Sequence, residues 1–440
     1  MRNGKRHTCN HYAPYSILKT AKDTNCQPKQ KPVNGTIQCL KLFIGAVSQA
    51  PLAICGGIKM KVLIAIDSLK GSLTSLEAGH AIAEGIRRTG TNADLLVRPL
   101  ADGGEGTVDA LVYGMGGTKR HITVTGPLGN PVDCEYGIIE KNHTAILEMS
   151  AAAGIMLVPA QKRNPLRTTT YGVGEMISDA IRNGCRRFII GIGGSATNDG
   201  GIGMLQALGF DFLDKDQNPV PFGAHGLELL HSINGSRVIP ELSLCEFRVA
   251  CDVTNPLCGP QGCSAVYGPQ KGATPSMITR MDQWLKAYAD LAKSQFPHTD
   301  PKQPGAGAAG GLGFAFLTFT NAALQSGIRI VLEETKLENY IKEADIVVTG
   351  EGCLDGQSAM GKAPIGVAKL AKKYGKPVLA FAGSVTKEAI ECNKNGIDAF
   401  FSILRRPTTL EEAMEPQNAK ANMADTAEQV FRLWSLKAGE

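Results

Sequence analysis

Short apolar runs alternate along this chain with longer segments that repeat apolar residues at helical spacing. The main apolar runs occupy residues 62–66, 187–193, 345–350, 378–383 and 399–404, and further strand signals lie at 144–149 and 246–253. Because few polar residues interrupt them, they are typical of strands buried on both faces of a sheet. Between them, 76–88 has the spacing of an amphipathic helix beginning near Ser75, and 364–374 opens on a proline and ends before a glycine. This alternation predicts an α/β fold with a largely parallel sheet.

The middle of the chain breaks this alternation. From about residue 123 to 310, Gly, Pro and Asn become frequent and the strand signals shorten. The alternation returns after the glycine run 305–313, which we interpret as a loop or hinge. We therefore predict a discontinuous Rossmann-like or flavodoxin-like parallel-sheet domain over 60–125 and 315–440, with a second, mixed α/β domain inserted at 126–314. The cleft between the two domains is the expected active site.

Residues 1–59 differ from the rest of the chain in charge. They hold nine Lys and Arg residues and one acid, which leaves 37 basic and 40 acidic residues over 60–440. That larger part has no basic excess, so no nucleic-acid partner is expected. The apolar run at 39–57 is too short and too interrupted to predict a membrane span. Because Met60 is followed at once by an apolar strand, we interpret 1–59 as an N-terminal extension that is disordered or not translated, with a targeting segment as the alternative.

The twelve cysteines of the chain are scattered and complete no disulfide framework or zinc pattern. This usage is typical of free thiols in a reducing compartment. We therefore expect a cytoplasmic protein without a membrane partner.

The strongest chemical signal is the loop GIGGSATNDGG at 191–201. Its backbone N–H groups and polar side chains can bind a phosphate or nucleotide at the start of the next helix, through Gly193, Gly194, Ser195 and Asn198. Asp199 in the same loop is placed as a general base or a metal ligand. A purely structural loop seldom needs this density of glycines and polar groups, so we favour a catalytic role for Asp199.

Two more clusters follow early strands of the first predicted domain. After the run at 62–66, Lys70 can neutralise a phosphate and Ser68 can donate a hydrogen bond to it. In the turn ADGGEGT, the carboxylate of Asp102 suits Mg²⁺ or a substrate hydroxyl. Acidic residues also occupy turns for structural reasons alone, which is the competing interpretation.

The motif ACDVTNP ends another strand and supplies Asp252 as a base or metal ligand, with Asn255 beside it as a substrate contact. Lys271, in the GPQKGA segment that follows, is placed to bind a substrate carboxylate.

The segment 351–364 carries the last group of candidates. Glu351 and Asp355 are possible metal ligands. GQSAMGKA is not a Walker loop, because Ala363 stands where that motif has the hydroxyl that holds Mg²⁺. Lys362 can still bind phosphate at the start of the helix that follows.

Taken in order, these clusters resemble the bacterial glycerate kinase family of the two-domain type I class. The family motifs DS-x-K-x-S, ADGGEGT, GIGGSATNDGG, ACDVTNPL, GPQKGA, PGAGAAGG-x-G and TGEG-x-x-D-x-Q all stand in this sequence. Two positions depart from the pattern: Ile66 replaces a proline, and Cys353 replaces an arginine. The resemblance implies ATP-dependent phosphorylation of D-glycerate, with Mg²⁺, in glyoxylate or sugar-acid catabolism. It favours 2-phosphoglycerate over 3-phosphoglycerate as the product.

Two alternatives belong to other classes of protein. A non-catalytic sensor of sugar acids with the same fold would bind the same ligand without turnover. A nucleotide-dependent oxidoreductase is disfavoured, because no G-x-G-x-x-G follows the first strand. D-glycerate and ATP are the expected small-molecule partners, and a homodimer is an assembly that the sequence leaves open.

Overall fold

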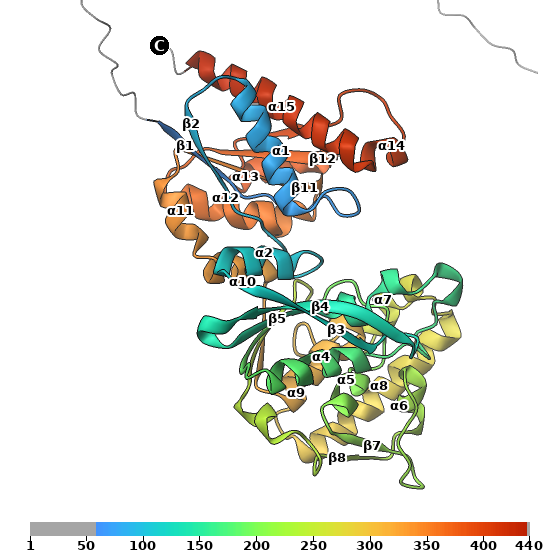
Figure 1. The fold of residues 1–440 in the computed structure, drawn as a ribbon. Coiled ribbons are helices and arrows are strands. Elements are labelled where there is room, and N and C mark those ends of the chain that lie inside the picture. Colours follow the sequence, from blue (N-terminus) through green and yellow to red (C-terminus); the bar gives the residue numbers. More distant parts are fainter. Residues whose placement is uncertain (1–58, 438–440) are drawn as a thin grey trace, which may run out of the picture. The chain divides into compact units, whose positions relative to one another are not determined.

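The computed structural model describes residues 59–437, so the interpretation of 1–59 as an extension lies, except for Lys59, outside the described residues. Within this range, five strands form a wholly parallel sheet in the order β13-β12-β11-β1-β2. They are β1 (Met60–Ile64), β2 (Ala93–Val97), β11 (Ile346–Leu354), β12 (Val378–Val385) and β13 (Ala399–Ser402). Four of them, β1, β2, β11 and β12, are labelled in Figure 1. Four of the predicted apolar runs coincide with strands of this sheet. β1, β11 and β12 are largely buried, as their lack of polar residues predicted, whereas the edge strand β13 is only half-buried.

The strand order contains one reversal. The chain runs from β1 to β2 on one side, and then returns to β11 on the other side of β1. This is the flavodoxin-like order 2-1-3-4-5, in which a crevice opens beyond the carboxyl ends of the strands at the reversal, the topological switch point. The predicted Rossmann-like or flavodoxin-like sheet is therefore confirmed, and its switch point lies between β1 and β11.

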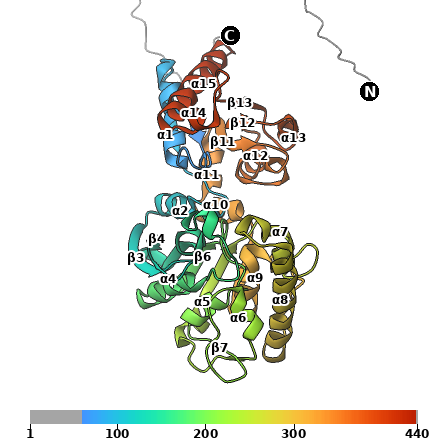
Figure 2. The same cartoon turned by 90° about the vertical axis from the view of Figure 1, so that its right-hand side faces the viewer.

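Helices cover both faces of this first sheet. α1 (Ser75–Arg88) and α15 (Pro416–Lys437) pack together on one face, and α11 (Leu337–Glu343) and α12 (Ala363–Lys373) on the other (Figure 2). α1 starts one residue after Thr74, whose hydroxyl accepts a hydrogen bond from the Glu77 N–H while the Glu77 carboxylate accepts one from the Thr74 N–H. This capping box fixes the end of the loop that leaves β1. α13 (Glu391–Lys394) and α14 (Leu410–Met414) are short connecting helices.

A second sheet has the order β10-β9-β6-β5-β4-β3. Its strands are β3 (Thr118–Thr125), β4 (Pro131–Ile139), β5 (Thr144–Glu148), β6 (Arg187–Gly191), β9 (Glu246–Ala250) and β10 (Ala322–Gln325). β5, β6, β9 and β10 run parallel, whereas β3, β4 and β5 run antiparallel. This is the mixed sheet that the shorter strand signals predicted.

The helices of the second half share one large core with this sheet. α4 (Tyr171–Arg182) and α5 (Ile202–Ala207) pack against each other (Figure 1), and β7 (Asp211–Leu213) and β8 (Ser232–Asn234) form a separate two-stranded antiparallel sheet. The other helices here are α3 (Met149–Ala153), α6 (Ala224–Leu229), α7 (Cys263–Tyr267), α8 (Pro275–Gln295) and α9 (Ala308–Phe319).

The strand pairing refines where the two halves divide. β3 and β10 pair within the second sheet, although the predicted limits of 125 and 315 assign both to the first domain. A strand's own sequence indicates that it is a strand but not which partner it pairs with, since pairing is decided by tertiary packing. The division of the chain into two domains stays a prediction, with 118–325 as the span of the second sheet.

The glycine run at 305–313 combines a turn and the start of a helix. α9 begins at Ala308, but Ala309, Gly310 and Gly311 have left-handed backbone conformations, and regular helix continues after them. The predicted loop is therefore present as far as Gly311. The tight turn brings the Gly200 N–H to the Gly310 carbonyl at 2.9 Å, so it packs against the glycine-rich loop.

One hydrophobic core connects the two sheets. α2 (Thr107–Met115) and α10 (Gly327–Glu334) contact the second sheet and also share a core with α11, α12 and the first sheet. The connection into α2, which carries Asp102, and the start of α10, which contacts Asp252, are therefore anchored on buried surfaces from both sheets.

The turn before α2 requires glycine. Gly103 has φ +88°, and a Cβ there would lie 2.5 Å from the Ala250 Cβ and 3.2 Å from the Gly327 Cα. A Cβ on Gly191 would in turn lie 2.4 Å from the Gly103 carbonyl oxygen. The backbone of the ADGG turn can approach β6 and β9 this closely only because side chains are missing at these positions.

We predict that Gly103→Ala lowers stability by about 1–3 kcal/mol more than Gly129→Ala, because the first substitution adds overpacking to backbone strain. Gly129 is the matched control, since it has φ +82° and open space around its Cβ position. Thermal unfolding of both variants beside the unmodified protein gives the comparison. Equal midpoints for the two variants would contradict the close approach at Gly103.

Candidate active site

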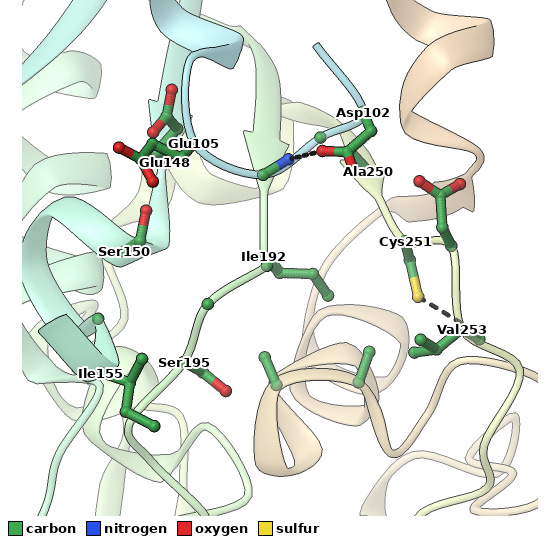
Figure 3. A pocket seen from close by; sticks show the side chains of 18 of the residues that line it. Asp102, Glu105, Glu148, Ser150, Ile155, Ile192, Ser195, Ala250, Cys251 and Val253 are labelled. Atoms are coloured by element: carbon green, nitrogen blue, oxygen red, sulfur yellow. Dashed lines mark hydrogen bonds between the residues drawn. The ribbon is translucent and has the colours of Figure 1, made fainter. Parts of the chain in front are cut away.

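Loops at the carboxyl ends of both sheets enclose two pockets. The first, here called the glycine-loop pocket, has a volume of about 660 Å³ and is lined by residues that follow β5, β6 and β9 (Figure 3). The second, the switch-point pocket, has a volume of about 400 Å³ and is lined by residues that follow β1, β11, β12 and β13. Both lie where ligands bind in α/β proteins.

The two pockets share two lining residues, Lys70 and Asp102. The Lys70 ammonium lies 3.3 Å from one Asp102 oxygen, and the other oxygen accepts a hydrogen bond of 3.1 Å from the Gly104 N–H. Although burial alone would lower it, the carboxylates of Asp102 and Asp67 raise the pKa of Lys70. The structure thus places a charged lysine and its carboxylate partner at the junction of the pockets.

Two buried carboxyl groups line the switch-point pocket. Asp67 accepts a hydrogen bond of 2.7 Å from the Ser68 N–H, and burial together with the nearby Asp102 charge raises the pKa of Asp67 to about 8. Burial also raises the pKa of Glu351, and its Oε1 atom has no hydrogen-bond partner among residues 59–437. A buried carboxylate oxygen without a donor, on a side chain that lines a pocket, is suited to a cation.

This donor set fits a magnesium ion held jointly with phosphate. Nowhere in residues 59–437 do three His, Cys, Asp or Glu side chains gather as a metal centre of their own. Mg²⁺ typically uses one or two carboxylates and takes its other ligands from phosphate and water. Glu351 is free to serve in this way. Asp355 also lines the pocket, but the Ser358 N–H and hydroxyl already occupy its Oδ1 at 2.9 and 3.2 Å.

The predicted phosphate ligands Ser68 and Lys362 line the same pocket. The Ser68 hydroxyl is buried without a partner in the described residues. Lys362 is the residue before α12, is half-buried, and forms no ion pair with any residue of the range 59–437. Its position beside a helix N-terminus favours an anion there.

The glycine-loop pocket brings together four further predicted residues. Gly193, Gly194 and Ser195 line it, and so does Lys271. The buried Lys271 ammonium donates to the Ser195 hydroxyl at 2.8 Å and to the Thr197 carbonyl at 2.6 Å, and burial lowers the pKa of this lysine to about 8. Lys271 therefore orients Ser195 directly.

Asp252 lines the glycine-loop pocket, with its side chain accessible from that cavity. One of its oxygens accepts a hydrogen bond of 3.1 Å from the Gly327 N–H, at the start of α10. Partial burial removes water from around the Asp252 carboxylate and thereby raises its pKa. It is thus a second carboxylate within reach of a ligand in this pocket.

The position of Asp199 does not support the predicted base or metal ligand. Its carboxylate is fully buried, lines neither pocket, and accepts hydrogen bonds from the Thr170 N–H and hydroxyl, both at 2.8 Å, and from the Gly201 N–H at 3.1 Å. These donors tie the glycine-rich loop to the start of α4. The sequence suggested otherwise because the composition of a loop does not show which of its side chains face the pocket.

Two other predicted contacts also point away from the pockets. The buried Asn198 amide donates to the Ser264 hydroxyl at 2.9 Å, so it does not offer itself to a phosphate. The Asn255 side chain accepts from the Tyr267 hydroxyl at 2.7 Å and donates to the Gln261 carbonyl at 2.8 Å. Both amides hold loops in place.

Glu148 and Ser150 line the glycine-loop pocket and were missed by the sequence interpretation (Figure 3). The Glu148 carboxylate accepts a hydrogen bond of 2.8 Å from the Val108 N–H in α2, and burial raises the pKa of Glu148 to about 7. Their position at the carboxyl end of β5 could have identified them as site residues, because the carboxyl ends of parallel strands lie at a common edge of the sheet.

Cys353 stands where the glycerate kinase pattern has an arginine, and it lines the switch-point pocket as a half-buried thiol. The departure from the family pattern therefore falls within the candidate site itself. Among the helices of residues 59–437, none has both the length and the apolar composition that crossing a bilayer requires.

Two pockets meeting at a lysine–carboxylate pair, at the ends of parallel strands, define an α/β enzyme of the phosphoryl-transfer class. The sequence profile described as the Glycerate kinase family matches residues 62–435, and the chain belongs to this family. Membership of a kinase family implies ATP as co-substrate.

Individual proteins agree with the family match. The chain is 50% identical to Glycerate 2-kinase of Escherichia coli K12 over 355 residues, which cover 80% of this chain and 93% of the relative. It is 46% identical to Glycerate kinase of Haemophilus influenzae over 378 residues, 86% of this chain and 100% of the relative. A crystal structure of a protein assigned as glycerate kinase 2 from Salmonella typhimurium LT2 superposes with a TM-score of 0.78 at 48% identity, over 87% of this chain and 99% of that one.

The hydrogen bonds of Asp199 predict a structural defect when it is replaced. Asp199→Asn turns an amide group toward a backbone N–H, which should lower stability by about 1–3 kcal/mol, while kcat of the folded fraction changes only a few-fold. Thermal unfolding and steady-state kinetics at low temperature separate the two effects. A hundredfold loss of kcat at an unchanged midpoint would restore Asp199 as the catalytic acid.

The raised pKa of Glu148 predicts that the stability of the protein depends on pH. Its pKa is about 7 in the folded protein against 4.5 as the reference value, so the folded state holds an extra proton between these pH values. The stability associated with this group is fully present below pH 4.5 and is lost as pH rises to about 7. Glu148→Gln keeps an acceptor for Val108 but removes this titration.

The difference in melting temperature, Glu148→Gln minus unmodified protein, should therefore rise across this pH window and then level off. Glu105→Gln, at a neighbouring exposed carboxylate, is the control for charge alone. A difference that is constant with pH would show that Glu148 ionises normally.

Proposed function

We propose that this enzyme transfers the γ-phosphoryl group of ATP to the C2 hydroxyl of D-glycerate, giving 2-phosphoglycerate and ADP in glyoxylate or sugar-acid catabolism. The observation that carries the proposal is the pair Lys70–Asp102, which belongs to both pockets and holds opposite charges 3.3 Å apart. A donor in one pocket and an acceptor in the other would meet at this pair.

Phosphoryl transfer depends on positioning and on neutralising charge. The glycerate hydroxyl oxygen forms a bond to the γ-phosphorus, the bond from that phosphorus to the β,γ-bridging oxygen breaks, and ADP leaves with the bonding electrons. In this proposal Asp102 accepts a hydrogen bond from the hydroxyl and then its proton, since it is the carboxylate at the junction. Lys70 faces the same point and stabilises the negative charge of the phosphoryl oxygens.

The switch-point residues support a role for Mg²⁺. Glu351 would hold the ion, and Asp355 is a second candidate ligand. When it is bound, Mg²⁺ neutralises negative charge on the phosphate oxygens. Lys362 and Ser68 lie in the same pocket and can bind further phosphate oxygens. The unpaired Glu351 oxygen is the observation that favours this assignment.

The choice of the C2 hydroxyl is supported by the relative from Escherichia coli, whose name is Glycerate 2-kinase. Phosphorus NMR of the product formed from ATP, Mg²⁺ and D-glycerate tests it directly. We expect ADP and the resonance of 2-phosphoglycerate. A 3-phosphoglycerate resonance would correct the position of transfer, and tight binding of glycerate without ADP release would support the sensor instead.

Removing the junction carboxylate should affect the chemical step. We predict that Asp102→Asn lowers kcat on the order of 10²-fold or more, because it removes a general base and the partner of Lys70. Asp94→Asn is the control, an exposed carboxylate paired with Lys59 away from both pockets. If Asp102→Asn keeps kcat within a few-fold while Asp252→Asn abolishes turnover, Asp252 is the base.

The two lysines of the switch-point pocket should act on phosphate and not on folding. Lys70→Met and Lys362→Met keep the aliphatic stem and remove the charge, so we expect a raised KM for ATP or a lowered kcat, with stability changed by less than about 1 kcal/mol. Steady-state kinetics with each substrate varied gives the answer. A Lys362→Met enzyme with unchanged constants for ATP would remove that lysine from the mechanism.

A further inference from the structure

We infer that the two pockets divide the substrates: the nucleotide occupies the switch-point pocket, with its base against apolar side chains of the segment 403–414, and the hydroxy acid occupies the glycine-loop pocket. This inference rests on the proposed function and assigns its two sites. It reverses the interpretation of the glycine-rich loop as the nucleotide site, which was based on composition alone.

The topology of the first sheet suits a nucleotide. In open α/β sheets a nucleotide binds in the crevice at the switch point, where neighbouring connections leave on opposite faces of the sheet. The switch-point pocket is lined by residues that follow β1 and β11, the two strands at which the order reverses. The parallel strands of the second sheet, β5, β6, β9 and β10, follow one another in sequence order without a reversal. Only the first sheet offers this crevice among the described residues.

The chemical composition of the switch-point pocket also suits a nucleotide. Its polar part combines two ammonium groups, Lys70 and Lys362, with the unpaired Glu351 oxygen, a set that suits a polyphosphate with a bound divalent cation. Its other part is apolar and comes mostly from one stretch of chain, through Ile403, Leu404, Leu410 and Met414. Such a pocket complements a ligand with a flat apolar ring at one end and a polyanion at the other.

This apolar wall exposes surface that a base could cover. The Leu404 side chain is 40% exposed and that of Leu410 is 76% exposed, although both border a cavity. Large apolar side chains left open beside a concave site gain free energy when a ligand covers them. A planar base lying between these residues and the end of β12 would provide that cover.

The glycine-loop pocket suits a small carboxylate instead. The Ser195 hydroxyl accepts its hydrogen bond from Lys271, which leaves the Ser195 hydrogen free to donate to a ligand oxygen. Gly193 and Gly194, which have no side chains to block access, are exposed to the cavity next to it. Lys271 thus acts as a positioning residue for Ser195 and adds positive charge behind the carboxylate.

Two cysteines of the chain can report ligand binding, one in each pocket. Cys353 lines the switch-point pocket and Cys251 lines the glycine-loop pocket, and both are half-buried free thiols. The unmodified full-length protein is alkylated with iodoacetamide at about pH 8.5, where thiolate is available, and each cysteine is followed by peptide mass spectrometry. The ligands tested are Mg²⁺ with a non-hydrolysable ATP analogue, and D-glycerate. ADP formation from ATP and D-glycerate is measured in the same preparation.

We expect the ATP analogue to slow alkylation of Cys353 several-fold and leave Cys251 unaffected, and D-glycerate to do the opposite. Protection of Cys251 by the analogue, alone or together with Cys353, would overturn the assignment. An active preparation in which the analogue leaves Cys353 unprotected would also overturn it, while the proposed function would stand. Absence of turnover would refute the proposed function, whichever cysteine is protected.

Matched substitutions give an independent readout. Leu410→Ser and Met156→Ser each remove one strongly exposed apolar side chain, 76% and 87% accessible, from the rim of one pocket. We expect Leu410→Ser to raise KM for ATP several-fold with KM for D-glycerate unchanged. If Met156→Ser raises KM for ATP and Leu410→Ser does not, the nucleotide lies in the glycine-loop pocket.

Discussion

The ion pair between Lys70 and Asp102 is the interaction on which the candidate site depends. The two side chains come from different loops of the first sheet, and together they form the part of the wall that the two pockets have in common. Because the Lys70 side chain is 53% exposed and that of Asp102 18%, the pair contributes little to folding. Its importance lies in placing one positive and one negative group where the pockets meet.

The loops that hold this pair are fixed by packing rather than by polar bonds alone. The turn after Asp102 lies against β6 and β9 at glycine positions, and the helices that follow it share a core with both sheets. A site built at such a junction can present groups from two sheets to one reacting phosphorus. The same packing leaves the Glu351 oxygen buried without a donor, a cost that ligand binding would relieve.

Much of the fold was predictable from the sequence, because strands buried on both faces appear in it as runs of apolar residues. The runs at 345–350 and 378–383 mark β11 and β12, and the proline at 364 marks the first turn of α12. The sequence does not show which strands pair with each other. The predicted limits of 125 and 315 therefore assigned β3 and β10 to the first domain, although both pair within the second sheet. The site was predictable in part for a similar reason. Position at a strand's carboxyl end identified Lys70, Asp102 and Asp252, whereas the direction of a side chain within a loop, which separates Ser195 from Asp199, is decided by tertiary packing.

The most direct test of the account is a crystal structure of the full chain with Mg²⁺, a non-hydrolysable ATP analogue and D-glycerate bound together. The account predicts that the Lys70 ammonium lies about 3 Å from a γ-phosphate oxygen and the Asp102 carboxylate about 3 Å from the glycerate C2 hydroxyl. A complex with both substrates in place, but with the γ-phosphate and the hydroxyl meeting away from these two residues, would contradict it.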